Sequence, residues 1–330
     1  LLTPKAQQYG QNSEKLLMIR GIIPVMLTPF DAEDRLDHDS LERLTNWYLE
    51  HDAAALFAVC QSSEMQHLSV AERTELARTI VGLVGGQKPI VASGHISTKL
   101  HDQISELTKM STTGIDALVL VTNRLDPKNL GYDAFRYNLE ALLNHLPPEL
   151  PLGLYECPAP FRRLLSDDEL KFCRDTNRFV VLKDVSCDLE IIKHRLNIVD
   201  GTQFGIINAN AAIAFRSMLA GSPGFAGVFT NFHPDLYAWL LANCDKTDPH
   251  LPDLVTFLAM AANAEAFAYP VLAKLYHQKI GTISCAHARA IDYDARKHHW
   301  ALDNIIEHII EGTERFRARI FAKDHRMWDS

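Results

Sequence analysis

The chain has 330 residues, of which 47% are hydrophobic and 22% charged, and its formal net charge is -8. This composition is typical of a globular protein, and the negative charge gives no electrostatic reason to expect nucleic acid or an anionic membrane as a partner. A small-molecule function is therefore favoured. The length fits either two average domains or one α/β barrel, which takes about 250 residues.

The cysteine pattern and the distribution of apolar residues indicate the cellular compartment of the protein. Six cysteines are scattered without CxxC spacing, at positions 60, 157, 173, 187, 244 and 285, and a chain of this size needs no disulfides for stability. The first 17 residues lack the continuous apolar stretch of a signal peptide, and no later segment offers about 18 uninterrupted apolar residues for a membrane span. We expect a cytoplasmic protein without a membrane partner.

Short apolar runs alternate with amphipathic segments along most of the chain. The runs predict eight strands, at residues 21–30, 54–59, 88–95, 116–122, 150–158, 179–186, 203–208 and 224–231. Segments with helical spacing lie between them, at residues 40–50, 69–84, 99–114, 132–146, 166–176 and 210–221. Beyond residue 234 the pattern is helical throughout.

This alternation predicts an α/β fold, a closed (β/α)8 TIM barrel with a C-terminal helical extension. We expect an N-terminal extension at residues 1–19, the barrel with its catalytic site at 20–235, and a helical region packed on the barrel at 236–330. The alternative is an open doubly wound sheet. No GxGxxG follows the first strand, and "GLVGG" at residues 82–86 is placed to end a helix, which disfavours that alternative.

A lysine interrupts the sixth apolar run, "FVVLKDVS". Alternate residues of a barrel strand point inward, so Val181, Lys183 and Val185 share the inner face while Leu182 and Asp184 face the helices. Lys183 then lies near the carboxyl end of the barrel, where barrel enzymes have their active sites, and a desolvated lysine is a good nucleophile toward a ketone. The alternative is a lysine that extends from the strand end into solvent.

Two further features point to the same end of the barrel. Tyr155 lies two residues after Gly153 in "GLYECP", so it shares the inner face of the fifth strand and could shuttle protons during imine chemistry, or simply fill the interior. The segment "CQSSEM" at 60–65 follows the second strand and offers hydroxyl and backbone N–H donors for a carboxylate. Ordinary turn chemistry would explain that segment equally well.

These segments together resemble the superfamily of dihydrodipicolinate synthase and N-acetylneuraminate lyase, the pyruvate-dependent class I aldolases. The resemblance covers roughly residues 20–320. It rests on "GIIPVMLTPF", "CQSSEM", "LYECP", "VVLKDVS" and "AGSPGFAGVFTN", of which the tyrosine and lysine segments are the specific ones.

The resemblance implies a Schiff-base lysine at Lys183 and a proton shuttle at Tyr155. It places Gln61 and Ser62 where the family holds the pyruvate carboxylate. The remaining residues expected to bind substrate are Ser63, Thr28, Ile207, Asn208, Arg124 and Arg162. No metal, flavin or nicotinamide cofactor is implied, because the imine itself supplies the electron sink.

The chain departs from dihydrodipicolinate synthases at three places. Gln61 replaces one hydroxyl of the carboxylate pair. Pro160 stands where those synthases have an arginine for the aldehyde's carboxylate, although Arg162 follows two residues later. Asn123 and Arg124 stand where those synthases have a tyrosine pair that completes a relay across a subunit interface.

The sequence therefore predicts an aldolase, lyase or hydro-lyase that acts on pyruvate or a 2-oxo (sugar) acid through Lys183, with an aldehyde as second small molecule. One alternative is 4-hydroxy-tetrahydrodipicolinate synthase proper. Another is a noncatalytic barrel that binds a 2-oxo acid or a sugar acid. The resemblance also implies a homo-oligomer, either a dimer or a tetramer. A metal enzyme is disfavoured because the fifteen histidines do not cluster with carboxylates.

Overall fold

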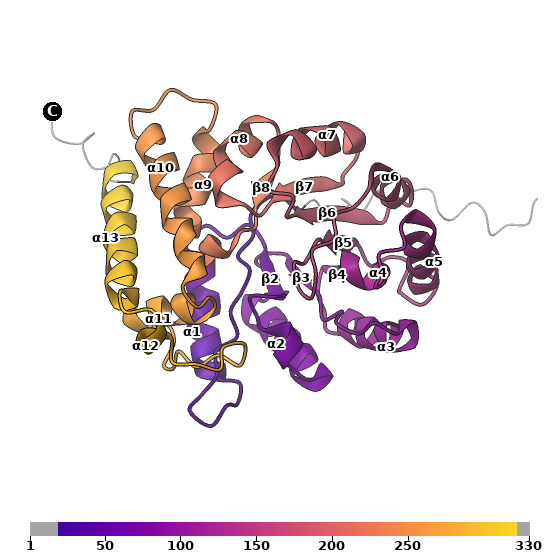
Figure 1. Cartoon of the computed structure of the whole chain (residues 1–330), viewed down its shortest axis with the longest axis horizontal. Coiled ribbons are helices and arrows are strands. Elements are labelled where there is room, and N and C mark those ends of the chain that lie inside the picture. The colour runs from indigo at the N-terminus through magenta and orange to yellow at the C-terminus, as the bar shows by residue number, and fades with distance from the viewer. Residues whose placement is uncertain (1–18, 322–330) are drawn as a thin grey trace, which may run out of the picture.

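The structure is a computed structural model in which residues 19–321 are described. The predicted N-terminal extension, residues 1–19, lies outside the described residues except for Ile19. A ring of parallel strands occupies the centre of the molecule and helices surround it, as Figure 1 shows. The strands are β1 (Gly21–Ile22), β2 (Leu56–Val59), β3 (Ile90–Ala92), β4 (Ala117–Val121), β5 (Leu152–Tyr155), β6 (Phe179–Asp184), β7 (Gly205–Asn208) and β8 (Gly224–Phe225).

All strand pairings are parallel and the strands follow one another around the sheet. Their order is β1-β8-β7-β6-β5-β4-β3-β2. The two ends of this order meet through a parallel bridge between Val25 and Phe57, whose backbone is also bonded to Pro24 and Met26 at N–O distances of 2.9 and 3.1 Å. The sheet is therefore closed, and the prediction of a (β/α)8 barrel is confirmed.

Two glycines allow the first and last strands to approach each other. Gly21 pairs with Gly224, and a Cβ atom added at Gly224 would lie 2.0 Å from the Gly21 carbonyl oxygen. No side chain fits at that distance, because it is far inside van der Waals contact. Glycine at position 224 is thus a steric requirement of barrel closure.

Helices follow the strands as the amphipathic segments predict. Those around the barrel are α1 (His38–Glu50), α2 (Val70–Val84), α3 (Leu100–Ser111), α4 (Thr122–Leu125), α5 (Tyr132–Leu143), α6 (Asp167–Asp175), α7 (Leu189–Val199) and α8 (Ala214–Leu219). Capping boxes start two of them, with Ser69 and Glu72 at α2 and Ser166 and Glu169 at α6. Gly85 ends α2 with a left-handed φ of 57°, which agrees with the prediction that "GLVGG" terminates a helix.

The structure differs from the sequence-based prediction in three elements. Strands β1 and β8 are only two residues long, and Val228–Asn231 after β8 forms a short helical turn, η4. Helix α7 was not among the individually predicted segments. Its buried face carries Ile192, Arg195 and Val199, and the arginine interrupts the apolar stripe by which a helix is recognised.

A set of helices follows β8 and lies against one side of the barrel, at the left of Figure 1. No further strand occurs after Phe225 within the described part of the chain. These helices are α9 (Pro234–Asn243), α10 (Leu251–Ala261), α11 (Val271–Lys279), α12 (Ala295–His298) and α13 (Leu302–Ile320), with a helical turn η5 (Ala262–Ala266) between α10 and α11.

Across residues 19–321 no single helix is both long and apolar enough to cross a membrane. One pair of helical segments, Leu251–Ala266 and Val271–Lys279, reaches that length and hydropathy only when the two are taken together, and the chain bends by 117° between them.

A buried ion pair links this helical region to the barrel. The Lys274 ammonium of α11 lies 2.6 Å from the carboxylate of Glu64, in the loop after β2, and both side chains are fully buried. The same ammonium donates to the carbonyl of His287, and the second carboxylate oxygen of Glu64 accepts from the backbone N–H of Ala290. Glu64 itself has a left-handed φ of 58°, so this pair also fixes an unusual backbone conformation in the loop.

Replacing Lys274 by Met tests how much this pair contributes to stability. The change leaves the Glu64 carboxylate buried without its partner, so we expect the free energy of unfolding to fall by about 3–5 kcal/mol. Urea denaturation followed by circular dichroism measures the difference. The matched control is Lys279→Met, which removes an exposed pair with Glu307 and should cost only about 0–1 kcal/mol. Equal losses in the two variants would contradict a structural role for the buried pair.

Candidate active site

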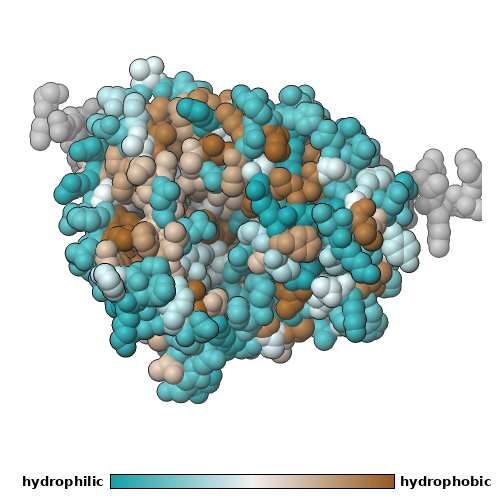
Figure 2. Space-filling view, viewed as in Figure 1, coloured by the Kyte–Doolittle hydropathy of each residue, from teal (hydrophilic) through white to brown (hydrophobic). Residues whose placement is uncertain are grey.

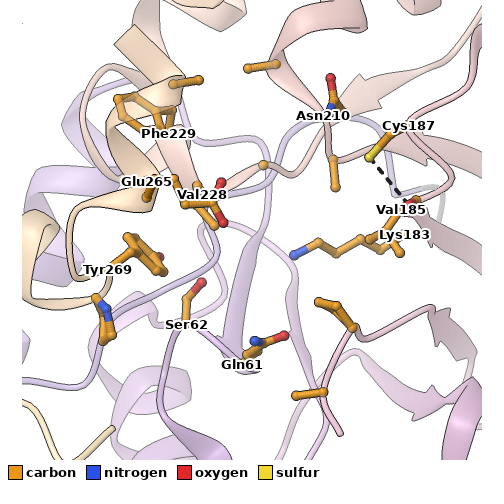
Figure 3. Close-up of a pocket in the computed structure, with 18 of the residues that line it drawn as sticks. Gln61, Ser62, Lys183, Val185, Cys187, Asn210, Val228, Phe229, Glu265 and Tyr269 are labelled. Carbon is orange, nitrogen blue, oxygen red and sulfur yellow. Dashed lines mark hydrogen bonds between the residues drawn. The ribbon is translucent and has the colours of Figure 1, made fainter. Parts of the chain in front are cut away.

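Strands β5 and β6 bring Tyr155 and Lys183 together. The two residues are direct partners in the parallel register, and both line the same cavity. The Lys183 Nζ atom lies 4.5 Å from the centroid of the Tyr155 ring and 5.7 Å from that of Phe57 on β2. Figure 3 shows the lysine reaching into a cavity, with Gln61 and Ser62 on one side and Glu265 and Tyr269 beyond them.

The opposite face of β6 is turned toward the helices, as the alternation predicts. Asp184 accepts hydrogen bonds from Arg195 of α7, and Arg195 also binds Glu156, the residue after Tyr155. All three side chains are buried. This ion-pair network ties the carboxyl ends of β5 and β6 to α7 and so fixes the relative positions of Tyr155 and Lys183.

Removal from water sets the protonation of Lys183. The side chain is only 7% exposed, and burial lowers the pKa of Lys183 below its ordinary value of 10.5, although nearby Cys60, Cys157 and Glu265 act in the opposite direction. A lowered pKa leaves a larger fraction of neutral amine at a given pH, and the neutral amine is the nucleophilic form.

Tyr155 provides a phenol beside this amine. Its hydroxyl group donates to the side-chain oxygen of Gln61 at 3.4 Å, and the Cys157 thiol donates to the same oxygen at 3.3 Å. Burial, followed by the neighbouring cysteines, holds the pKa of Tyr155 well above its usual value. The phenol therefore keeps its proton over the ordinary pH range and is available as a donor.

A glycine makes room beneath the pair. A Cβ atom at Gly153, two residues before Tyr155, would lie 2.9 Å from a methyl carbon of Val181 and 3.1 Å from one of Val119. The space is already filled by those two valines, which close the barrel interior under Lys183. Tyr155 and Lys183 thus lie on a packed floor at the carboxyl end of the strands, where catalytic residues of such barrels are found.

Residues predicted in the loop after β2 divide into two groups. Gln61 and Ser62 line the cavity. The Ser63 hydroxyl instead donates to the carbonyls of Met26 and Ala58 at 2.7 and 3.0 Å, and Thr28 donates to the Ser63 carbonyl at 2.7 Å. Ser63 and Thr28 therefore hold the loop in shape rather than face the cavity.

The other predicted residues divide in the same way. Arg162 lines the cavity and donates to the carbonyl of Ser186, but Arg124, Ile207 and Asn208 do not line it. Ile207 is buried beside Lys183 in the sheet, and the Asn208 side chain is bonded to the backbone of Asn210.

Asn123, next to Arg124, has a structural role in the loop after β5. Its amide donates to the carbonyls of Cys157, Ala159 and Phe161 at 2.7 to 3.1 Å. It thereby shapes the segment that carries Pro160 and leads to Arg162.

Among the cavity residues that sequence reasoning missed, Glu265 and Tyr269 come from the helical region. Glu265 lies in η5 and Tyr269 shortly after it. The Tyr269 hydroxyl accepts from the Asn231 amide at 3.0 Å. The available signal was a carboxylate within the alanine-rich run 259–268.

The cavity has a volume of about 930 Å³, within the range of small-molecule sites. Its wall combines groups from the barrel and from the helical region. The polar residues that line it are Gln61, Ser62, Glu64, Gln66, His67, Tyr155, Arg162, Lys183, Cys187, Asn210, Asn263, Glu265 and Tyr269. A buried amine beside a phenol donor in such a space has the groups needed to form an imine with a ketone.

Comparison with known proteins finds relatives that match most of the chain. A family model described as "Dihydrodipicolinate synthetase family" matches residues 18–251. The 4-hydroxy-tetrahydrodipicolinate synthase of Pseudomonas aeruginosa is 30% identical over 234 residues, which are 70% of this chain and 77% of the relative. That of Stutzerimonas stutzeri is 31% identical over 262 residues, 77% of this chain and 86% of the relative.

Solved structures share the fold. The dihydrodipicolinate synthase of Acinetobacter baumannii, solved with pyruvate, has a TM-score of 0.77 and 24% identity and covers 88% of this chain and 99% of its own. The 4-hydroxy-tetrahydrodipicolinate synthase of Methylacidiphilum fumariolicum has a TM-score of 0.79 at 19% identity, over 92% and 99% of the two chains. A monomeric dihydrodipicolinate synthase variant has a TM-score of 0.78 at 18% identity, over 90% and 98%.

The protonation of Lys183 is testable by labelling. Because burial lowers the pKa of Lys183, we expect its reaction with trace acetic anhydride to rise with pH and to reach half of its maximum below pH 10.5. Peptide mass spectrometry measures the labelled fraction at each pH, with exposed Lys128 as a reference for reagent reactivity. A midpoint at or above 10.5 would show that the amine is not destabilised as an ammonium ion.

Proposed function

Because the chain belongs to the dihydrodipicolinate synthetase family, we propose that it is a lyase that forms a Schiff base between Lys183 and pyruvate or another 2-oxo acid. Family membership supports the broader class, a pyruvate-dependent class I lyase. The observation that carries the assignment to residues is the Lys183 ammonium nitrogen 4.5 Å from the centroid of the Tyr155 ring, inside the cavity.

In the proposed reaction the neutral Lys183 amine attacks the ketone carbon of the 2-oxo acid. The nitrogen passes one proton to the resulting oxyanion, and the carbinolamine hydroxyl takes up a second proton from Tyr155 and leaves as water, which gives the protonated imine. The Tyr155 phenolate takes a proton from the adjacent carbon to give an enamine, whose carbon bonds to the aldehyde carbon while Tyr155 returns that proton to the aldehyde oxygen. Water then adds to the new protonated imine, the Tyr155 phenolate takes up the released proton, and the product ketone leaves the neutral Lys183 amine. Cleavage runs through the same steps in reverse.

The remaining groups are assigned by their places in the cavity. Ser62 and the Gln61 amide bind the carboxylate of the 2-oxo acid, and Arg162 meets the distal part of the second substrate. The barrel, residues 20–235, carries the reacting side chains, and the helical region, residues 236–330, completes the cavity wall. We also propose that the protein acts in the cytoplasm as a homo-oligomer, a dimer or a tetramer, on the basis of the family resemblance.

The second substrate differs from that of dihydrodipicolinate synthases in this proposal. Pro160 stands in place of the arginine for the aldehyde's carboxylate, and the Asn123 amide is already engaged by three backbone carbonyls. These two positions therefore provide neither an arginine for the aldehyde's carboxylate nor a tyrosine for the relay across the subunit interface. An aldolase or hydro-lyase that uses another aldehyde would explain the absence of both residues.

Borohydride reduction in the presence of pyruvate tests the proposal directly. We expect a reduced pyruvate adduct on Lys183, located by intact mass and peptide mapping, because borohydride converts an imine to a stable secondary amine. Lys183→Ala should abolish the adduct, whereas Lys193→Ala, on the exposed face of α7, should leave it unchanged. Absence of any adduct with pyruvate and with longer 2-oxo acids would favour a noncatalytic binding barrel.

Tyr155→Phe tests the proton shuttle. The change removes only the hydroxyl oxygen, so packing against Phe57 is preserved and the adduct should still form, but more slowly. General acid–base catalysis contributes about 10²- to 10⁴-fold, and we expect the rate of imine formation to fall within that range. Stopped-flow absorbance or timed borohydride quenching gives the rate. Tyr137→Phe, at a side chain 70% exposed, is the control; an unchanged rate in Tyr155→Phe would remove Tyr155 from the mechanism.

A further inference from the structure

One wall of the cavity comes from outside the residues that the family model matches. That model ends at residue 251, whereas Asn263 and Glu265 lie in η5 and both line the cavity. Figure 3 shows the Glu265 side chain on the opposite side of the cavity from the Lys183 strand. Figure 2 shows that the surrounding surface over α10 is mainly apolar, so a carboxylate at this place is a local exception.

Glu265 is an acid without an ion-pair partner across the cavity from Lys183. Within residues 19–321 it makes no hydrogen bond or ion pair, whereas Glu64, the other acid of the cavity wall, is bound to Lys274. Burial raises the pKa of Glu265, and the charge of Lys183 opposes that shift. The Glu265 side chain is exposed to the solvent that fills the cavity, so a bound ligand can replace water at its carboxylate.

Three neutral amides of the same cavity also have unused polar atoms. The Gln66 Nε2 donor is buried without a partner among the described residues. Within residues 19–321, the Asn263 Oδ1 atom accepts no hydrogen bond, and the Asn210 Nδ2 atom donates none. A hydroxyl group both donates and accepts, so a wall of one carboxylate and several amides suits hydroxyl groups.

We propose that Glu265, with the amides of Asn210, Asn263 and Gln66, forms a hydroxyl-binding wall that makes a hydroxylated aldehyde the preferred second substrate. This inference rests on the proposed Schiff-base function. An aldehyde that carries its own carboxylate is disfavoured at this wall, because its charge would face that of Glu265. Glu265 acts here as a specificity-determining residue, and the carbon–carbon bond is made at Lys183.

Paired aldehydes test the inference. Condensation with pyruvate is measured for glyceraldehyde and for propanal, which have the same number of carbons, in the native enzyme, Glu265→Ala and Glu265→Gln. Loss of a hydrogen bond between a charged group and a hydroxyl should lower kcat/KM for glyceraldehyde about 10- to 100-fold in Glu265→Ala. The value for propanal should change by less than about 3-fold, because propanal offers no hydroxyl to lose. Glu265→Gln keeps an acceptor oxygen and should retain more of the glyceraldehyde activity.

Controls separate this inference from the proposed function. Borohydride trapping of pyruvate on Lys183 is measured in every variant, and Asp253→Asn, an exposed acid of α10, should behave as the native enzyme does with both aldehydes. No trapping in the native enzyme would overturn the Schiff-base function itself. Normal trapping with equal losses for glyceraldehyde and propanal, or with no loss for either, would overturn the hydroxyl-binding wall alone. If Glu265→Ala does not fold, the same comparison is made with Glu265→Gln.

Discussion

A lysine inside a closed parallel barrel is the constraint on which the rest of the site depends. The interior of a barrel is normally filled with apolar side chains, and an ammonium ion there loses most of its hydration. Lys183 is accommodated by the faces of Tyr155 and Phe57, which stabilise a cation, and by the opening of the cavity above it. The remaining cost lowers the pKa of Lys183, so the same burial that destabilises the charged form favours the neutral amine that the proposed reaction requires.

Two buried ion-pair systems keep this arrangement in place. On the outer face of β5 and β6, Arg195 joins Glu156 and Asp184, the residues that directly follow Tyr155 and Lys183 in the chain. At the cavity wall, Lys274 joins the loop after β2 to the helical region. Removal of one partner from a buried pair leaves an uncompensated charge, so both systems restrict the positions that these segments can adopt. The helical region is in this way part of the site, since it carries Glu265 and Tyr269 into the cavity.

The departures from dihydrodipicolinate synthases have physical consequences that the structure makes specific. Gln61 accepts hydrogen bonds from both the Tyr155 phenol and the Cys157 thiol, so its amide lies beside Tyr155 at a position that a smaller hydroxyl residue would not fill. Asn123 is committed to the backbone of the loop after β5. The proposed chemistry therefore uses an amine and a phenol that the resemblance to the family implies, with Gln61 and Asn123 as departures around them.

The sequence by itself determined the barrel and the central pair. Eight apolar runs that alternate with amphipathic segments admit few folds, and the period of two in a strand places Tyr155 and Lys183 on the inner face. Boundaries were less predictable. Strands β1 and β8 are only two residues long, and α7 carries a buried arginine on its apolar side. Only the tertiary structure decided which polar residues reach the cavity. The side chains of three predicted residues bind backbone groups instead, those of Thr28, Ser63 and Asn208. Glu265 reaches the cavity from a segment about 80 residues beyond Lys183. Contacts between such distant segments depend on tertiary packing, which local sequence spacing does not encode.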